Sequence, residues 1–122
     1  MTVDLNLFAF LAGAVLYMIY GGIYYSILLG KKDQDGAGPV KYVVAVLVAF
    51  ISSALVGVLV QGTESSGLAS GALVGGIVGI LVSIVYLKNA LFGLMTKRMF
   101  LIAIGDHLII FTLLGALHGW FL

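Results

Sequence analysis

The chain has 122 residues, of which 62% are hydrophobic and 9% charged, whereas about a quarter of the residues in an ordinary soluble domain are charged. A domain of this size cannot bury so many apolar residues in one core, so the composition excludes a soluble globule and predicts that the lipid bilayer covers much of the surface. A net charge of +1 without a basic stripe excludes nucleic acid as a partner, and the absence of cysteine excludes disulfides, a thiolate nucleophile and cysteine-based metal sites.

Four apolar segments are each long enough to cross a bilayer as a helix, which takes about 18 to 20 residues. They cover residues 5–29, 40–60, 68–87 and 99–121 and are separated by polar or glycine-rich breaks. Pro39 precedes the second segment, at a helix start where its missing N–H costs little. The sequence therefore predicts an all-α polytopic membrane protein, with four transmembrane helices in an antiparallel bundle that forms a single domain over residues 1–122.

A line of polar and small residues runs along the first predicted helix. At 100° per residue, six residues lie within about 40° of one line: Asn6, Gly13, Tyr17, Tyr20, Tyr24 and Lys31. Phenolic hydroxyl groups are costly in hydrocarbon without hydrogen-bond partners, so we expect this line to face other helices or water. It forms either a hydrogen-bonded bundle interior or the lining of a path or pocket for a small solute or lipid headgroup.

The second and third predicted helices carry small residues at every fourth position. These are Ala45, Ala49, Ser53 and Gly57 in the second helix, and Gly67, Gly71, Gly75, Gly79 and Ser83 in the third. In lipid, small residues let helix backbones approach closely and gain van der Waals contact, as in GxxxG packing. The short break at residues 61–67 makes these helices antiparallel neighbours, so we expect packing within the chain. Association of copies into a homo-oligomer through the third helix is the alternative.

Asp106 is the acidic residue that falls inside a predicted span, beside His107 and about two turns from the start of the fourth helix. A carboxyl group in lipid either finds a cation or hydrogen-bond donors, or takes up a proton, and such residues recur in proton relays and ion paths. One interpretation is a titratable transport or gating element. The other is a structural tether, held by tyrosine hydroxyls, Asn89 or the long side chains of Lys97 and Arg98.

The motifs of common enzyme classes are absent from the sequence. There is no Gly-x-Ser-x-Gly, no Walker loop and no His-Glu-x-x-His. His107 and His118 are too sparse for a metal site, which needs three or four converging ligands. We therefore expect neither an enzyme nor a bound metal or other cofactor.

The run Gly22–Lys31, GIYYSILLGK, resembles the end of the first helix in the domain-of-unknown-function 1761 family, where a Gly, an aromatic-Tyr-Ser and a Gly-Lys follow in this order. The second half of the chain is also similar to the family. There the family has an Asn and a Phe after the third helix, then a basic residue, an Asp within the fourth helix, and a closing Gly with Trp. The matching residues are Asn89, Phe92, Arg98, Asp106, Gly119 and Trp120. Tyr24 stands where the family usually has Trp, and Ile27 where Pro is common.

This resemblance implies a small prokaryotic four-helix membrane protein, and no biochemical activity comes with it. It groups Tyr24, Tyr25, Asn89 and Asp106 as a related set near the cytoplasmic side. We expect a pore or carrier for a small solute or ion, with Asp106 as its titratable element, or a structural or accessory protein that binds lipid or a partner helix through its glycine-rich face. The pore or pocket would be lined by Tyr17, Tyr20, Tyr24, Tyr25, Asn89, Asp106 and His107.

Charge predicts the orientation in the membrane. All six basic residues lie in or beside the first and third breaks: Lys31, Lys32, Lys41, Lys88, Lys97 and Arg98. Because cytoplasmic loops keep the positive charge, both of these breaks face the cytoplasm. The sequence therefore predicts a multi-pass protein of the cell membrane with both termini outside the cytoplasm.

Reporter fusions test this orientation. A reporter fused after Leu122 should be active outside the cytoplasm, and one inserted at residues 36–38 should be active inside, because of the bias in basic residues between the loops. Activity of the two fusions on the opposite sides would contradict the predicted topology.

Overall fold

The computed structural model describes residues 6–28 and 40–122. This part contains four helices: α1 (Leu7–Leu28), α3 (Val40–Gly62), α4 (Leu68–Leu91) and α5 (Lys97–Phe121). Each is long and apolar enough to cross a membrane, which confirms the prediction of an all-α protein with four transmembrane helices. Lys31, Lys32 and Pro39, which belong to the first predicted break, lie outside the described residues.

Polar residues and glycines set the helix ends. Asn6 Oδ1 accepts a hydrogen bond from the Ala9 amide at 3.1 Å, so this residue of the polar line caps α1. Thr96 caps α5 in the same way, through the amide of Met99. Gly67 and Gly93 turn the chain before and after α4 with φ angles of 98° and 77°, in the left-handed region that glycine tolerates best.

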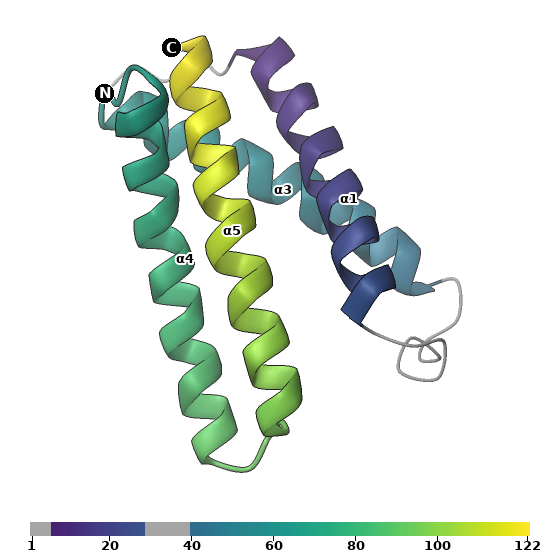
Figure 1. The fold of residues 1–122 in the computed structure, drawn as a ribbon. Helices are drawn as coiled ribbons and strands as arrows, with labels where there is room; N and C mark the ends of the chain where they lie inside the picture. Colours follow the sequence, from purple (N-terminus) through teal and green to yellow (C-terminus); the bar gives the residue numbers. More distant parts are fainter. Residues whose placement is uncertain (1–5, 29–39) are drawn as a thin grey trace.

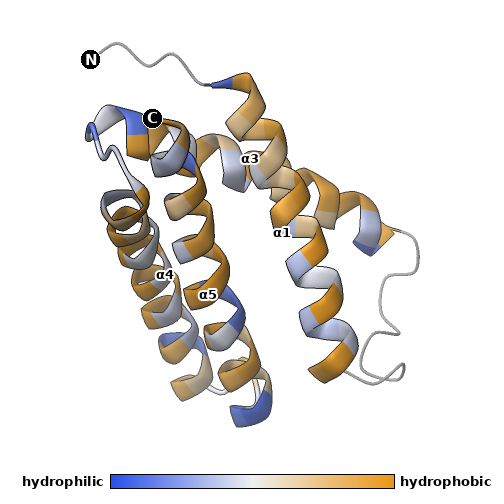
Figure 2. Cartoon of the chain, turned by 45° about the horizontal axis from the view of Figure 1, so that its top comes forward, coloured by the Kyte–Doolittle hydropathy of each residue, from blue (hydrophilic) through white to orange (hydrophobic). Residues whose placement is uncertain are grey.

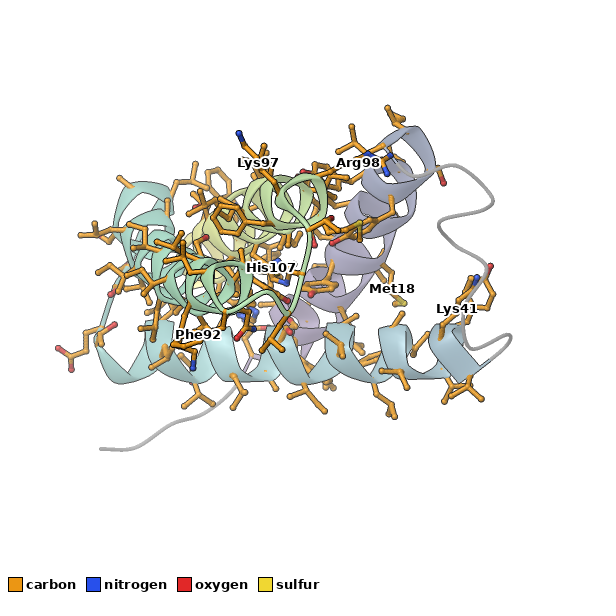
Figure 3. All side chains as sticks on the ribbon, turned by 90° about the horizontal axis from the view of Figure 1, so that it is seen from below. Met18, Lys41, Phe92, Lys97, Arg98 and His107 are labelled. Carbon is orange, nitrogen blue, oxygen red and sulfur yellow. The ribbon has the colours of Figure 1, made fainter. Side chains whose placement is uncertain are left out.

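The helices form a hairpin with two further helices against it (Figure 1). Helices α4 and α5 lie side by side and run antiparallel, and α1 lies on the other side of α5. Helix α3 crosses these three obliquely, and the view from below shows it lying across one side of them (Figure 3). Hydrophobic residues predominate in all four helices, with hydrophilic residues at helix ends and on one stretch of α5 (Figure 2), and many of the large hydrophobic side chains are exposed. Such a surface suits contact with lipid acyl chains.

The closest helix contact joins the backbones of α4 and α5. Gly71 and Gly75 on α4 are buried, and a Cβ atom there would collide with the backbone carbonyl groups of Gly115 and Phe111 on α5. A Cβ on Gly79 would lie 3.0 Å from the carbonyl oxygen of His107. No side chain other than hydrogen fits between the two backbones at Gly71 and Gly75.

This contact corrects the expected partner of the glycine face. The short break at residues 61–67 predicts packing of the third helix against the second, but the glycines of α4 meet α5 instead. The connections at residues 63–67 and 92–96 are both short, so connection length does not select between the two neighbours. Gly115 and Gly119 on α5 supply a complementary pair of small residues, whereas α3 crosses too obliquely to follow the length of α4 (Figure 1).

Three of the four small residues predicted to line one face of α3 are buried, and Ala45 is exposed. Ala49, Ser53 and Gly57 are buried, and beside them Val56 and Val60 pack against Leu114 of α5 in the apolar centre of the bundle. Tyr17, Val74 and Phe111 cover this centre from the other three helices. Residues from all four helices thus meet in this apolar centre.

Substitutions at two adjacent glycines test the backbone contact. Gly75→Ala should lower the free energy of unfolding by about 2 kcal/mol or more, and Gly75→Leu by more, because either side chain must push the backbones apart. Gly76→Ala is the matched control: its Cβ would lie 3.6 Å from Thr112 Oγ1, an ordinary contact, so stability should stay the same or rise slightly. Unfolding in detergent micelles measures both.

Leu73→Ala provides a second comparison, since Leu73 is 67% exposed and points to lipid. Leu73→Ala should lower the free energy of unfolding by less than Gly75→Leu does. Equal stability of the Gly75 and Gly76 variants would show that the backbones of α4 and α5 are not in contact.

Candidate functional site

Asp106 is a buried carboxyl group well inside a membrane-spanning helix. It lies on α5, about 13 Å along the helix axis from Lys97 at 1.5 Å per residue, and is 5% exposed. The Tyr25 hydroxyl, from α1, donates a hydrogen bond to Asp106 Oδ2 at 2.6 Å. The carboxyl group is therefore held from a second helix by a neutral side chain.

His107 lies next to this carboxyl group but hydrogen-bonds elsewhere. Its Nδ1 is 2.7 Å from the carbonyl oxygen of Ala103 and 3.7 Å from Asp106 Oδ2. A carbonyl oxygen can only accept, so Nδ1 carries a proton that it donates to Ala103. The imidazole ring packs between Tyr86 of α4 and Phe111, with ring centroids 5.1 and 5.9 Å away. His107 therefore joins the site to α4 as well.

A second tyrosine attaches to the same turn of α5. The Tyr24 hydroxyl donates to the carbonyl oxygen of Ile102 at 2.8 Å, and this oxygen is also the helical acceptor for the amide of Asp106. The hydroxyl contacts the position that a Cβ on Gly105 would take. Only glycine at residue 105 leaves room for this hydrogen bond, so Gly105 is a site residue that no pattern in the sequence marks.

Aromatic rings continue from this point along α1. Tyr24 stacks on Tyr20 and meets Tyr25 edge to face, with centroid distances of 5.5 and 5.3 Å. Tyr17 meets Phe111 of α5 at 6.4 Å. The hydroxyl oxygen of Tyr20 is buried and, among the described residues, has no hydrogen-bond partner. The tyrosine line thus includes one phenol whose hydrogen-bonding capacity is unused within the described part of the chain.

The structure brings most of the predicted lining residues together, and leaves one apart. Tyr17, Tyr20, Tyr24 and Tyr25 line the side of α1 nearest Asp106 and His107 on α5. Asn89 lies in the last turn of α4, where its carbonyl oxygen accepts from the amide of Leu94 at 2.9 Å. In the described residues, no hydrogen bond links the Asn89 side chain to Asp106.

The two cations considered as partners of Asp106 lie elsewhere. Arg98 Nη2 donates to the carbonyl oxygen of Leu28 at 3.0 Å, at the end of α1, and Lys97 points away from the other helices (Figure 3). Within the described part of the chain, neither forms an ion pair with Asp106. Nor do three or more His, Asp or Glu side chains converge there in a way that could hold a metal ion.

A separate polar contact joins three helices nearer the C-terminal end of α5. Ser53 Oγ on α3 donates to the carbonyl oxygen of Phe10 on α1 at 2.8 Å and lies 3.1 Å from His118 Nε2 on α5. The hydroxyl proton goes to Phe10, so Nε2 carries a proton and donates it to Ser53. Both side chains are buried, and Gly13 is the residue that leaves them room. We call Ser53, His118, Phe10 and Gly13 the three-helix clasp.

Nearly the whole chain is similar to one known protein family. The family model described as "Protein of unknown function (DUF1761)" matches residues 8–119. The chain belongs to this family. The DUF1761 match reaches into all four helices, so the resemblance noted from short motifs is confirmed over residues 8–119. No curated protein and no solved structure matches the chain. The description of the family names no activity.

Removing the Ser53 hydroxyl tests the three-helix clasp. Ser53→Ala leaves the buried His118 Nε2–H without its acceptor, and should lower the free energy of unfolding by about 1 kcal/mol. Ser83→Ala is the matched control, because the Ser83 hydroxyl donates to the Gly79 carbonyl within α4 and its loss breaks no contact between helices. Equal effects of the two substitutions on unfolding in micelles would contradict a clasp.

Proposed function

We propose that this protein moves a small ion or solute, with protons as the first candidate, across the cell membrane, and that Asp106 binds and releases it. The observation that supports this proposal is the contact between Asp106 and Tyr25. A hydroxyl can donate to a carboxylate and accept from a carboxylic acid, so this hydrogen bond suits both protonation states. A lysine or arginine partner would instead hold the carboxylate in its charged form.

The surroundings of Asp106 provide further groups that a migrating ion or solute needs. Intramembrane ionisable residues are expensive, and they commonly mark transport pathways. The phenols of Tyr17, Tyr20 and Tyr24 continue the polar line along α1, and the Tyr20 hydroxyl has no partner among the described residues. A water molecule or a polar solute would supply that hydrogen bond.

The proposed orientation places Asp106 nearer to the cytoplasmic side of the membrane than the three-helix clasp. With both termini outside the cytoplasm, as the basic loops favour, Lys97 marks the cytoplasmic end of α5. Asp106 then lies about 13 Å from that end, within the inner half of the membrane. An ion entering from the cytoplasm would meet Asp106 before it reached the three-helix clasp.

The second candidate is a structural or accessory role in which Asp106 is a tether. Tyr25 to Asp106 and Tyr24 to Ile102 both link α1 to α5, as a tether would. In this alternative, a partner helix or a second copy has to bind elsewhere than at Gly71 and Gly75, because α5 fills that glycine face. Lipid-facing surfaces of α1 and α3 remain for such a partner.

Flux into proteoliposomes separates the two roles. Purified protein in liposomes with an imposed pH gradient should carry protons, and Asp106→Asn should reduce this flux at least tenfold, because an amide can accept from Tyr25 but cannot exchange a proton. Glu64→Gln is the matched control, since it removes an exposed carboxylate outside the helices and should leave the flux unchanged.

The same liposomes should be tested with sodium, potassium and small neutral solutes. A wild-type protein that moves none of these, or an Asp106→Asn variant with the wild-type pH profile, would contradict the transport role and leave the tether.

A further inference from the structure

We infer that the cytoplasmic end of α1, residues 23–28, is a hinged gate over Asp106 that bends at Gly21 and Gly22 while the first half of α1, residues 7–20, stays in place. We call this segment the inner segment. The inference rests on the proposed function, because it assigns to α1 the control of access to the ion-binding carboxyl group. It concerns motion, however, and can be tested without any flux measurement.

The first half of α1 is fixed by close packing. All the buried residues of α1 lie there: Ala9, Gly13 and Ala14. Gly13 belongs to the three-helix clasp, where α1 approaches Ser53 and His118 too closely for a side chain. Ring contacts at 5.6 Å to Phe50 and 5.3 Å to Phe121 add to this attachment, from Phe10 and Phe8 respectively. Any movement of this half would break packing with both α3 and α5.

The inner segment is attached in a different way. It contains no buried residue, and Ile23 and Ile27 are 58% and 76% exposed. Polar atoms make three described hydrogen bonds between it and α5. Tyr24 donates to Ile102, Tyr25 donates to Asp106, and Arg98 donates to Leu28. Hydrogen bonds can be exchanged for water or a solute, whereas an interlocked backbone contact cannot.

Gly21 and Gly22 lie between these two halves and provide the place to bend. A Cβ built on either glycine would meet no described heavy atom within 4 Å, so close packing does not explain why glycine is present. Glycine lowers the cost of departing from helical geometry, and helix kinks concentrate at such pairs. Bending here would carry Tyr24 and Tyr25 away together and uncover Asp106, to which the Tyr25 hydroxyl now donates.

Distances between spin labels test the gate, and the natural chain has no cysteine that would interfere. One pair of labels reports on the inner segment, at Ser26 and Leu101, and a control pair reports on the fixed half, at Leu11 and Leu113; all four residues are exposed. Pulsed electron resonance in liposomes measures each pair. We expect the double variant Tyr24→Phe, Tyr25→Phe to add a second population of label distances in the inner pair. These distances should be longer by about 5 Å or more, roughly one helical turn, and the distances of the control pair should not change.

The glycines are tested in the same background. Gly21→Ala with Gly22→Ala has room for both methyl groups, so the protein should fold, and the stiffer helix should abolish the longer population. An inner pair that keeps one distance when the hydroxyls are removed would show a rigid α1. A change in both label pairs would show that α1 moves as a whole, and a longer population that survives the alanines would place the hinge elsewhere; each of these results overturns the gate.

The outcomes for gate and transport can be told apart. Gate opening in a protein that moves no ion in liposomes would reject the proposed function and keep the gate. Proton flux through a protein whose inner pair never changes distance would reject the gate and keep the proposed function.

Discussion

The contact between the backbones of α4 and α5 is the interaction on which the rest of the structure depends. Inside a bilayer no hydrophobic effect drives one helix toward another, so van der Waals contact between closely approaching backbones has to hold the pair together. Gly71 and Gly75 on one helix and Gly115 and Gly119 on the other allow that approach. Helix α5 thereby becomes a fixed support, with its remaining sides free to bind the other two helices.

The other two helices attach to α5 chiefly through polar groups and a small apolar centre. The three-helix clasp joins α1 and α3 to α5 at His118, and Tyr24 and Tyr25 join α1 to α5 one after the other around Asp106. Hydrocarbon offers these groups no alternative partners, so the polar atoms of one helix are matched by those of the next. The same requirement gives Asp106 a neutral partner that suits either protonation state, which is what the proposed transport role needs.

The two ends of α1 illustrate how stability and movement can be divided within one helix. Close packing at Gly13 leaves no freedom at the clasp, while the inner segment depends on hydrogen bonds beyond an unpacked glycine pair. Elements that open locally are generally those with few buried apolar contacts. A carboxyl group covered by such a segment is shielded from lipid while the segment is closed and becomes accessible when the segment opens.

The sequence by itself determined the class of the protein, its four spans and its family. Hydropathy depends on local composition, so segments such as 40–60 and 68–87 are recognisable without any knowledge of their neighbours, and α3 and α4 begin at the residues expected. The polar line of α1 was recognisable for the same reason, because helical periodicity places Tyr17, Tyr20 and Tyr24 on one face. Asp106 was evident as an acid within an apolar span.

Only the tertiary structure decided which partners these features meet. Small residues recur at four-residue spacing on α3 and α4 and again at Gly115 and Gly119 on α5, so the pattern did not select between neighbours, and the expected pairing of α4 with α3 was wrong. Tyr24 binds the Ile102 carbonyl oxygen, a group that every residue possesses and that no sequence pattern marks. Asn89 was expected near Asp106, but the antiparallel register of the glycine contact places the end of α4 beside the start of α5 and away from Asp106. Partner choice depends on how surfaces fit between helices, whereas span and periodicity are properties of each helix alone.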